Sequence, residues 1–173
     1  MSQKSKTAVV EATERRIGRG VPPNFMFRAV QTRVLEDLIP TAGRPKVTAI
    51  VAPVGYGKTV LMSTLFSHLR EQGEHCFWTA LDDRDSSLER ALRLLEDMAY
   101  RHSEELHPTQ ALFRGGEPME SRIDVLVEAA AKYPAPFTAF VDNLDSCTDE
   151  ALGHLLDRLV FESPPTVRFV FSS

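Results

Sequence analysis

Cysteine is scarce in this sequence, and long apolar runs are missing from it. Cys76 and Cys147 are its two cysteines, too few for a disulfide framework or for a zinc site built on cysteines. No stretch approaches the length of about 18 consecutive apolar residues that indicates a transmembrane helix, and the N-terminal residues lack the apolar core of a signal peptide. These absences predict a protein of the reducing cytoplasm that is neither exported nor membrane-spanning.

The net charge is also small, but the charged residues are unevenly distributed along the chain. The formal net charge is -4. Nine basic and four acidic residues lie in 1–46, which therefore carries +5, so the rest of the chain carries -9. A basic arm either contacts nucleic acid or is a solvated leader, and the lack of an aromatic or Arg-rich run favours the leader. We expect residues 1–20 to form a flexible basic leader and residues 21–173 to form one domain.

The most informative motif is the run from Ala52 to Thr59, A-P-V-G-Y-G-K-T. It lies between an apolar, β-like stretch over 47–51 and a helical pattern over 60–69, the setting of a phosphate-binding P-loop. Glycines let backbone N–H groups turn toward an anion, the lysine reaches the β- and γ-phosphates, and the threonine hydroxyl binds Mg²⁺. Ala52 replaces the first glycine of the usual pattern, a difference of one methyl group. The predicted nucleotide-binding residues are Val54, Gly55, Tyr56, Gly57, Lys58, Thr59 and Val60.

Strand-like and helical segments alternate along the chain. We expect strands over 47–51, 76–81, 137–141 and 167–171, and helices over 30–39, 60–69, 88–98, 123–130 and 152–160. Residues 102–119 lose this periodicity and contain proline and glycine, as in a surface loop. Alternation of this kind is typical of parallel strands joined by right-handed crossovers. It predicts an α/β, three-layer P-loop NTPase fold with a mainly parallel sheet and helices on both faces.

An acidic residue ends the third expected strand. The run Phe137-Thr138-Ala139-Phe140-Val141-Asp142 has the form of a Walker B element, whose carboxylate holds Mg²⁺ through its water shell. Asp142 and Thr59 are therefore the predicted metal-binding pair. The catalytic candidates are Asp142, Asn143 and Asp145. Asn143 can orient water but cannot accept its proton, and Asp145 either acts instead or caps a helix that begins near Thr148.

In their order and spacing, these residues resemble the N-terminal ATPase module of MalT-like, LuxR-type bacterial transcription activators, which belong to the STAND class of signal-transduction ATPases. The resemblance covers about residues 17–173. It is carried by Pro22-Pro23, 30–38 with Arg33, 52–59, Trp78-Thr79-Ala80-Leu81-Asp82 with Asp85, and Asp142-Asn143-Leu144-Asp145. Two positions differ from the family: Asn143 stands where a second Asp is common, and the sequence ends at Ser172-Ser173, where an Arg linked to γ-phosphate sensing would typically follow.

The resemblance implies a regulatory switch. ATP and an inducer would favour an assembled, active state through self-association of the full-length protein, and hydrolysis would reset it. The P-loop and Asp142 predict ATP or ADP with Mg²⁺ as cofactors. We expect slow or no hydrolysis by this chain, because Asn143 is a poor base and the stretch after Ser173 is missing from the sequence. The sequence contains no counterpart of that family's C-terminal helix-turn-helix, so DNA would be bound only through domains that the chain lacks. We also expect the ATPase domain to be truncated at its C-terminal end. Val30 and Arg33 would lie by the adenine; the alternative is that their helix packs on the sheet.

Two other function classes stay open. A free-standing P-loop enzyme, such as a small-molecule kinase, would place lid arginines on the transferred phosphate. Arg101, Arg114 and Arg122 lie in or near the irregular segment but are scattered. A nucleic-acid-stimulated, AAA-like ATPase would need an arginine finger or a basic channel, and the sequence shows neither.

Overall fold

The computed structural model describes residues 21–23, 33–38, 44–81, 89, 92–93, 95–96, 118–147 and 149–173. The predicted leader over 1–20, most of the expected helix over 88–98 and most of the expected loop over 102–119 lie outside the described residues. The described elements, in chain order, are α2 (Arg33–Leu38), β1 (Val47–Ile50), α3 (Lys58–Glu71), β2 (His75–Ala80), α5 (Met119–Lys132), β3 (Phe137–Asp142), the short 3-10 helix η1 (Leu144–Ser146), α6 (Ala151–Glu162) and β4 (Val167–Ser172).

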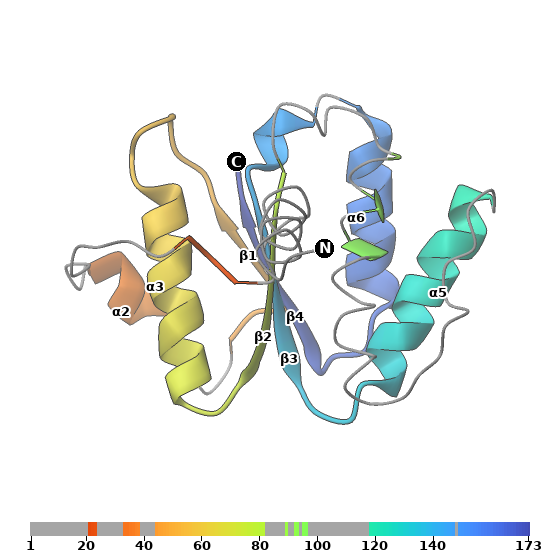
Figure 1. Cartoon of the computed structure of the whole chain (residues 1–173), viewed down its shortest axis with the longest axis horizontal. Coiled ribbons are helices and arrows are strands. Elements are labelled where there is room, and N and C mark those ends of the chain that lie inside the picture. The colour runs from red at the N-terminus through yellow and green to blue at the C-terminus, as the bar shows by residue number, and fades with distance from the viewer. Residues whose placement is uncertain are drawn as a thin grey trace, which may run out of the picture.

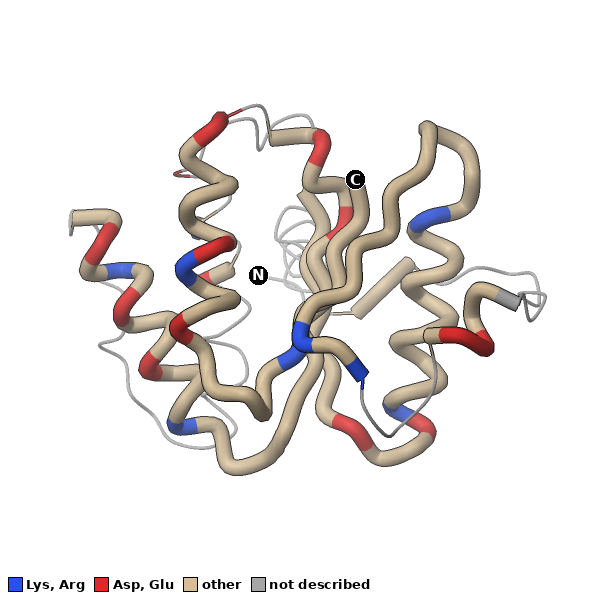
Figure 2. Tube along the Cα trace, turned by 180° about the vertical axis from the view of Figure 1, so that it is seen from behind, with Lys and Arg blue, Asp and Glu red and all other residues tan. Residues whose placement is uncertain are grey.

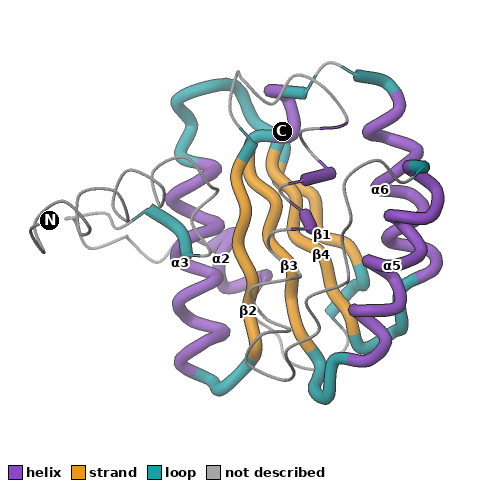
Figure 3. The backbone as a smooth tube through the Cα atoms, turned by 45° about the vertical axis from the view of Figure 1, so that its right-hand side comes forward, coloured by secondary structure: helices purple, strands orange, loops and turns teal. Residues whose placement is uncertain are grey.

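The four strands form one parallel sheet in the order β1-β4-β3-β2. Helices α2 and α3 cover one face of the sheet, and α5 and α6 cover the other (Figure 1 and Figure 3). The predicted α/β, three-layer fold with a parallel sheet is therefore confirmed. Each predicted strand is present, and its ends differ from the expected ones by one residue at most.

The sheet face toward α3 carries a compact aromatic core. Trp78 and Phe140 stack with ring centroids 5.8 Å apart, and Phe66 of α3 meets Phe140 edge-on at 5.4 Å. Met62 of α3 and Leu35 of α2 are buried in the same cluster. Successive side chains of a strand point to opposite faces, so side chains two positions apart share a face. Ala80 and Asp142, two positions after Trp78 and Phe140, therefore also lie on the α3 face.

The opposite face forms a second core under α5 and α6. Phe77 of β2, Ile123 of α5 and Leu155 of α6 are all buried in it. At the surface, Arg158 of α6 binds Asp124 of α5 at 2.8 Å, but both side chains are at least one-third exposed and such a pair adds little stability. Apolar burial is therefore what holds these two helices on the sheet. None of the helices in the described ranges is both long and apolar enough to cross a bilayer.

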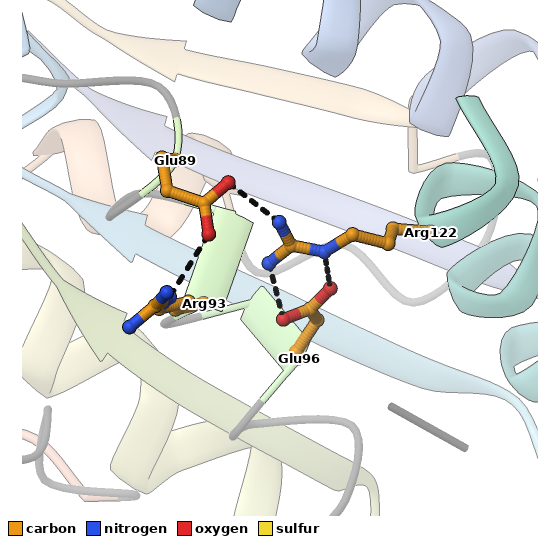
Figure 4. A network of polar contacts seen from close by, with 4 residues as sticks. All are labelled: Glu89, Arg93, Glu96 and Arg122. Carbon is orange, nitrogen blue, oxygen red and sulfur yellow. Dashed lines mark hydrogen bonds and ion pairs between the residues drawn. The ribbon is translucent and has the colours of Figure 1, made fainter. Parts of the chain in front are cut away.

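A network of charged side chains joins α5 to the segment that follows β2 (Figure 4). Arg122 of α5 donates to both carboxylate oxygens of Glu96, and its Nη1 donates to Glu89 at 2.6 Å. Glu96 is 6% exposed, whereas Glu89 is at the surface, where it also binds Arg93. The hydrogen bond from Arg122 lowers the pKa of Glu89, and the hydrogen bonds to Glu96 raise the pKa of Arg122. Among the described residues, the buried carboxylate of Glu96 is paired with the guanidinium of Arg122.

Replacing Arg122 with alanine should lower the free energy of unfolding by about 3 kcal/mol, because the carboxylate of Glu96 would stay buried without its partner. Arg93→Ala is the control: it removes a surface arginine 3.0 Å from Glu89. That change should cost at most about 0.5 kcal/mol. Urea unfolding followed by circular dichroism measures both variants, and equal losses would contradict the role given to Glu96. The small share from Glu89, whose pKa is lowered in the folded protein, should be present at neutral pH and disappear as the pH falls through that lowered pKa.

Candidate functional site

The loop between β1 and α3 contains two glycines with left-handed backbone angles. Gly55 has φ 87° and Gly57 has φ 80°, values that residues with a side chain rarely adopt. Between them, the N–H of Tyr56 donates to the carbonyl of Pro53 at 3.3 Å and closes a turn. A Cβ added at either glycine would meet no atom within 4 Å. The need for glycine therefore comes from the backbone angle and not from crowding.

Helix α3 begins immediately after this loop and has no side-chain cap. Gly57 occupies its N-cap position, and the Gly57 carbonyl accepts the N–H of Leu61 at 2.9 Å. The N–H groups of the first turn, which holds Thr59 and Val60, thus donate to no capping side chain. This 14-residue helix also directs the positive end of its dipole at the loop. A helix start of this kind suits an anion.

The side chain of Lys58 folds back onto its own loop. Its Nζ donates to the carbonyl of Ala52 at 2.6 Å. The N–H of Ala52 in turn donates at 3.2 Å to the carbonyl of Ser173, the residue after β4. Val54 and Tyr56 are 87% and 76% exposed. The loop is therefore anchored on β4 at its base, while its tip is open to solvent.

Asp142 ends β3 and is almost completely buried, with 1% of its surface exposed. It lies on the α3 face of the sheet, because Phe140 two positions earlier belongs to the core under α3. The hydroxyl of Ser172, at the end of β4, donates to Asp142 Oδ1. The backbone N–H of Asn143 donates to the same oxygen at 3.1 Å. Two donors therefore meet one oxygen of this carboxylate.

The P-loop and Asp142 lie at the same edge of the sheet. The strands are parallel, so their carboxyl ends meet at one edge, which is where open α/β sheets bind ligands. In Figure 1, the loop before α3 and the C-terminal residue stand at the same end of the sheet. Because β4 lies between β1 and β3, its end separates the P-loop from Asp142.

Asn143 has a left-handed backbone, with φ 59°, the one positive φ recorded for a described residue other than glycine. Its side-chain amide donates to the carbonyl of Leu81 at 3.3 Å, and the N–H of Leu81 donates to the carbonyl of Asp142 at 2.9 Å. The backbone N–H of Asn143 also donates to Ser172 Oγ at 2.9 Å. The Asn143 side-chain amide thus joins the ends of β2 and β3.

Asp145 lies in η1 and is exposed. Its alternative predicted role was to cap the next helix, expected to begin near Thr148. In the structure α6 begins at Ala151, whose N–H donates to Asp149 Oδ1 at 3.0 Å. The carboxylate that accepts a backbone N–H at the start of α6 is therefore that of Asp149 and not that of Asp145.

The two residues that the resemblance places by the adenine are less fully described. Val30 lies outside the described residues, and Arg33 is the first residue of α2. Leu35 in the same helix is 2% exposed and belongs to the core shared with α3 and the sheet. Helix α2 therefore packs on the core through Leu35, and the placement of Val30 and Arg33 by an adenine stays a prediction.

The chemistry of the donors at this edge fits a magnesium nucleotide. Phosphate oxygens accept hydrogen bonds from backbone N–H groups and from an ammonium such as that of Lys58. The Thr59 hydroxyl and the Asp142 carboxylate are oxygen ligands of the type that Mg²⁺ prefers. In the described part of the chain, no three His, Cys, Asp or Glu side chains are grouped so that they could hold a metal. A cation at this edge would therefore share its ligands among protein, phosphate and water, as Mg²⁺ commonly does.

Sequence reasoning missed Ser172 as a site residue. The sequence did carry a signal, because a small polar residue ends β4 just as Asp142 ends β3. The register shows why this matters: Val141 pairs with Phe171, so the next residues of the two strands are Asp142 and Ser172.

Comparison with known families gives a match that covers most of the chain. Residues 30–173 match the family described as Nephrocystin 3, N-terminal. A comparison with curated proteins gave no match. The family match agrees with the broader interpretation, a STAND or NTPase-like region, and gives no support for a MalT-like, LuxR-type regulator. Because the match includes the P-loop and every described strand, the chain belongs to the nephrocystin 3 N-terminal family.

Proposed function

We propose that this chain is an ATP-binding regulatory module, a switch that binds Mg-ATP or Mg-ADP and hydrolyses ATP slowly or not at all. The proposal rests on the geometry of one sheet edge. A loop with two left-handed glycines and an uncapped helix start lie at the edge that also holds the buried Asp142. The combination matters, because a glycine turn or a strand-end acid by itself has many structural uses.

Phosphate binding would fall to the loop and to Lys58. The N–H groups of the loop and of the first turn of α3 are the donors for phosphate oxygens. The Lys58 ammonium now donates to the Ala52 carbonyl at 2.6 Å. With a nucleotide present, we expect it to exchange this acceptor for the β- and γ-phosphate oxygens, because hydrogen bonds to a charged acceptor are stronger.

The cation would be held by Thr59 and Asp142. Mg²⁺, when bound, neutralises part of the charge on the phosphates. The Thr59 hydroxyl is in the first turn of α3, beside the loop, and the Asp142 carboxylate would bind the cation through water.

Slow hydrolysis is supported by the residues that follow Asp142. A general base must reach the attacking water and accept its proton. The Asn143 amide cannot accept a proton and already donates to the Leu81 carbonyl. Asp145 is exposed in η1. These positions favour a protein that responds to the bound nucleotide over one that turns it over rapidly.

The narrower form of the proposal is a module of a MalT-like, LuxR-type transcription activator. It rests on the sequence resemblance described above. In this form, nucleotide binding would favour self-association of the full-length protein, and other domains would bind DNA.

The described residues give little support to the two competing functions, a small-molecule kinase and a nucleic-acid-stimulated ATPase. Arg122 is bound by Glu96 and Glu89, which keeps this arginine from a transferred phosphate in a kinase. Arg101 and Arg114 lie outside the described residues. Figure 2 shows Lys and Arg positions scattered over the described part, with acidic positions between them along α5 and α6. This pattern is unlike the basic surface that a nucleic-acid-stimulated ATPase would need.

Lys58→Ala should weaken binding of Mg-ADP or Mg-ATP about tenfold or more, since a hydrogen bond between charged groups contributes about 1.5–3 kcal/mol. Lys132→Ala is the control, because this lysine is exposed on α5 and pairs with Glu128. Isothermal titration calorimetry at constant Mg²⁺ gives the affinities. If the two variants bind nucleotide equally well, the P-loop assignment is wrong.

Gly57→Ala should lower the free energy of unfolding by about 1–2 kcal/mol, because alanine is strained in the left-handed region. It should also weaken nucleotide binding, since the loop would relax to other angles. Gly153→Ala is the control: this glycine lies inside α6 with open space around it. Alanine there should stabilise the helix by about 0.5–1 kcal/mol. Thermal unfolding with and without Mg-ADP measures both effects, and a wild-type nucleotide shift in Gly57→Ala would contradict the role of the loop.

ATP turnover by this chain should stay below about 1 per second, the low end of ordinary enzymes. A steady-state phosphate-release assay at saturating Mg-ATP measures it, with Asp142→Asn as the background. Faster turnover in wild type would favour the enzyme alternative over the switch.

A further inference from the structure

Ser172 is a fully buried serine at the end of β4, with 0% of its surface exposed. Its hydroxyl donates to Asp142 Oδ1 and accepts the backbone N–H of Asn143 at 2.9 Å. A hydroxyl has one donor and two acceptor positions, so both bonds form together. With a partner on each side, this hydroxyl is fixed in one orientation.

The contacts of Ser172 act on one oxygen of the Asp142 carboxylate. Oδ1 accepts from Ser172 Oγ and, at 3.1 Å, from the N–H of Asn143. Within the described part of the chain, both hydrogen bonds to this carboxylate end on Oδ1. The carboxylate cannot rotate without breaking them, and Oδ2 is left for another partner.

The end of β4 also holds the base of the P-loop. The N–H of Ser173 donates to the Ile50 carbonyl at 3.1 Å, and the Ser173 carbonyl accepts the N–H of Ala52 at 3.2 Å. The Ala52 carbonyl is the present acceptor of Lys58. Two adjacent residues at the end of β4 therefore have separate roles: Ser173 holds the base of the loop before Lys58, and Ser172 holds the carboxylate of Asp142.

We propose that Ser172 is a positioning residue for the cation-binding carboxylate: by holding Asp142 Oδ1, it keeps Oδ2 for the Mg²⁺ that accompanies a nucleotide. This inference rests on the proposed function. Ser172 acts through Asp142 and not on the nucleotide itself. Without the hydroxyl, the Asp142 side chain gains rotamers, and ordering it again opposes cation binding.

The test compares ADP binding by the whole chain in Mg²⁺ and in EDTA, measured by calorimetry. In wild type, Mg²⁺ should strengthen ADP binding. Ser172→Ala should reduce this Mg²⁺-dependent gain about tenfold or more, the effect of losing one hydrogen bond to a charged group, and should leave the affinity in EDTA within about twofold. Ser172→Thr, which restores a hydroxyl, should recover the gain.

Ser163→Ala is the matched control. Ser163 is also buried, 5% exposed, but lies between α6 and β4, at the opposite end of β4. Its replacement tests the loss of a buried serine as such and should leave the gain from Mg²⁺ at the wild-type value.

A purely structural role for Ser172 predicts another pattern. ADP binding by Ser172→Ala would then weaken equally in Mg²⁺ and in EDTA, and that result would overturn the inference. A Mg²⁺-dependent gain in Ser172→Ala equal to that of wild type would also overturn it, while leaving the proposed nucleotide site intact. If wild type binds no ADP in either condition, the proposed function fails and this inference fails with it.

Discussion

The hydrogen bond from Ser172 to Asp142 joins the two halves of the candidate site. A carboxylate with 1% exposure is strongly destabilised unless donors surround it. One donor is the hydroxyl of Ser172, at the end of the neighbouring strand. The other is the backbone N–H of Asn143, a residue with a left-handed backbone. The donor from Ser172 depends on the strand order, because β4 lies between β3 and the strand that leads into the P-loop. The need to satisfy one buried charge thus organises the whole edge.

The fold could be predicted because its signals are local. Apolar strands, helical periodicity and the punctuation by proline and glycine lie within short windows, and parallel strands buried on both faces read as continuous apolar runs. All six residues of β3 are buried, for example. The glycines of the P-loop are equally local, since a left-handed φ is a property of one residue.

The hydrogen bonds of the candidate site could not be predicted from the sequence, because their partners lie far apart in the chain. Asn143 donates to Leu81, 62 residues away, and Ser172 donates to Asp142, 30 residues away. Such pairs follow from strand order and register, which periodicity does not encode. The start of α6 shows a smaller failure of the same kind: Asp145 and Asp149 are both suited to capping, and the position of the helix decides that Asp149 accepts the bond. Residue type therefore predicted which groups could act, but not which groups they meet.

The position of β1 has a consequence for how the protein is made. Among the described strands, β1 pairs with β4 alone, and Val47 lies opposite Phe169. Pairing across so long a stretch of chain requires a large loop to close before its contacts can form, which slows folding. On the ribosome, the P-loop sequence would emerge long before the strand that anchors its base. A nascent chain would thus carry the complete motif and still lack a shaped loop until β4 had emerged.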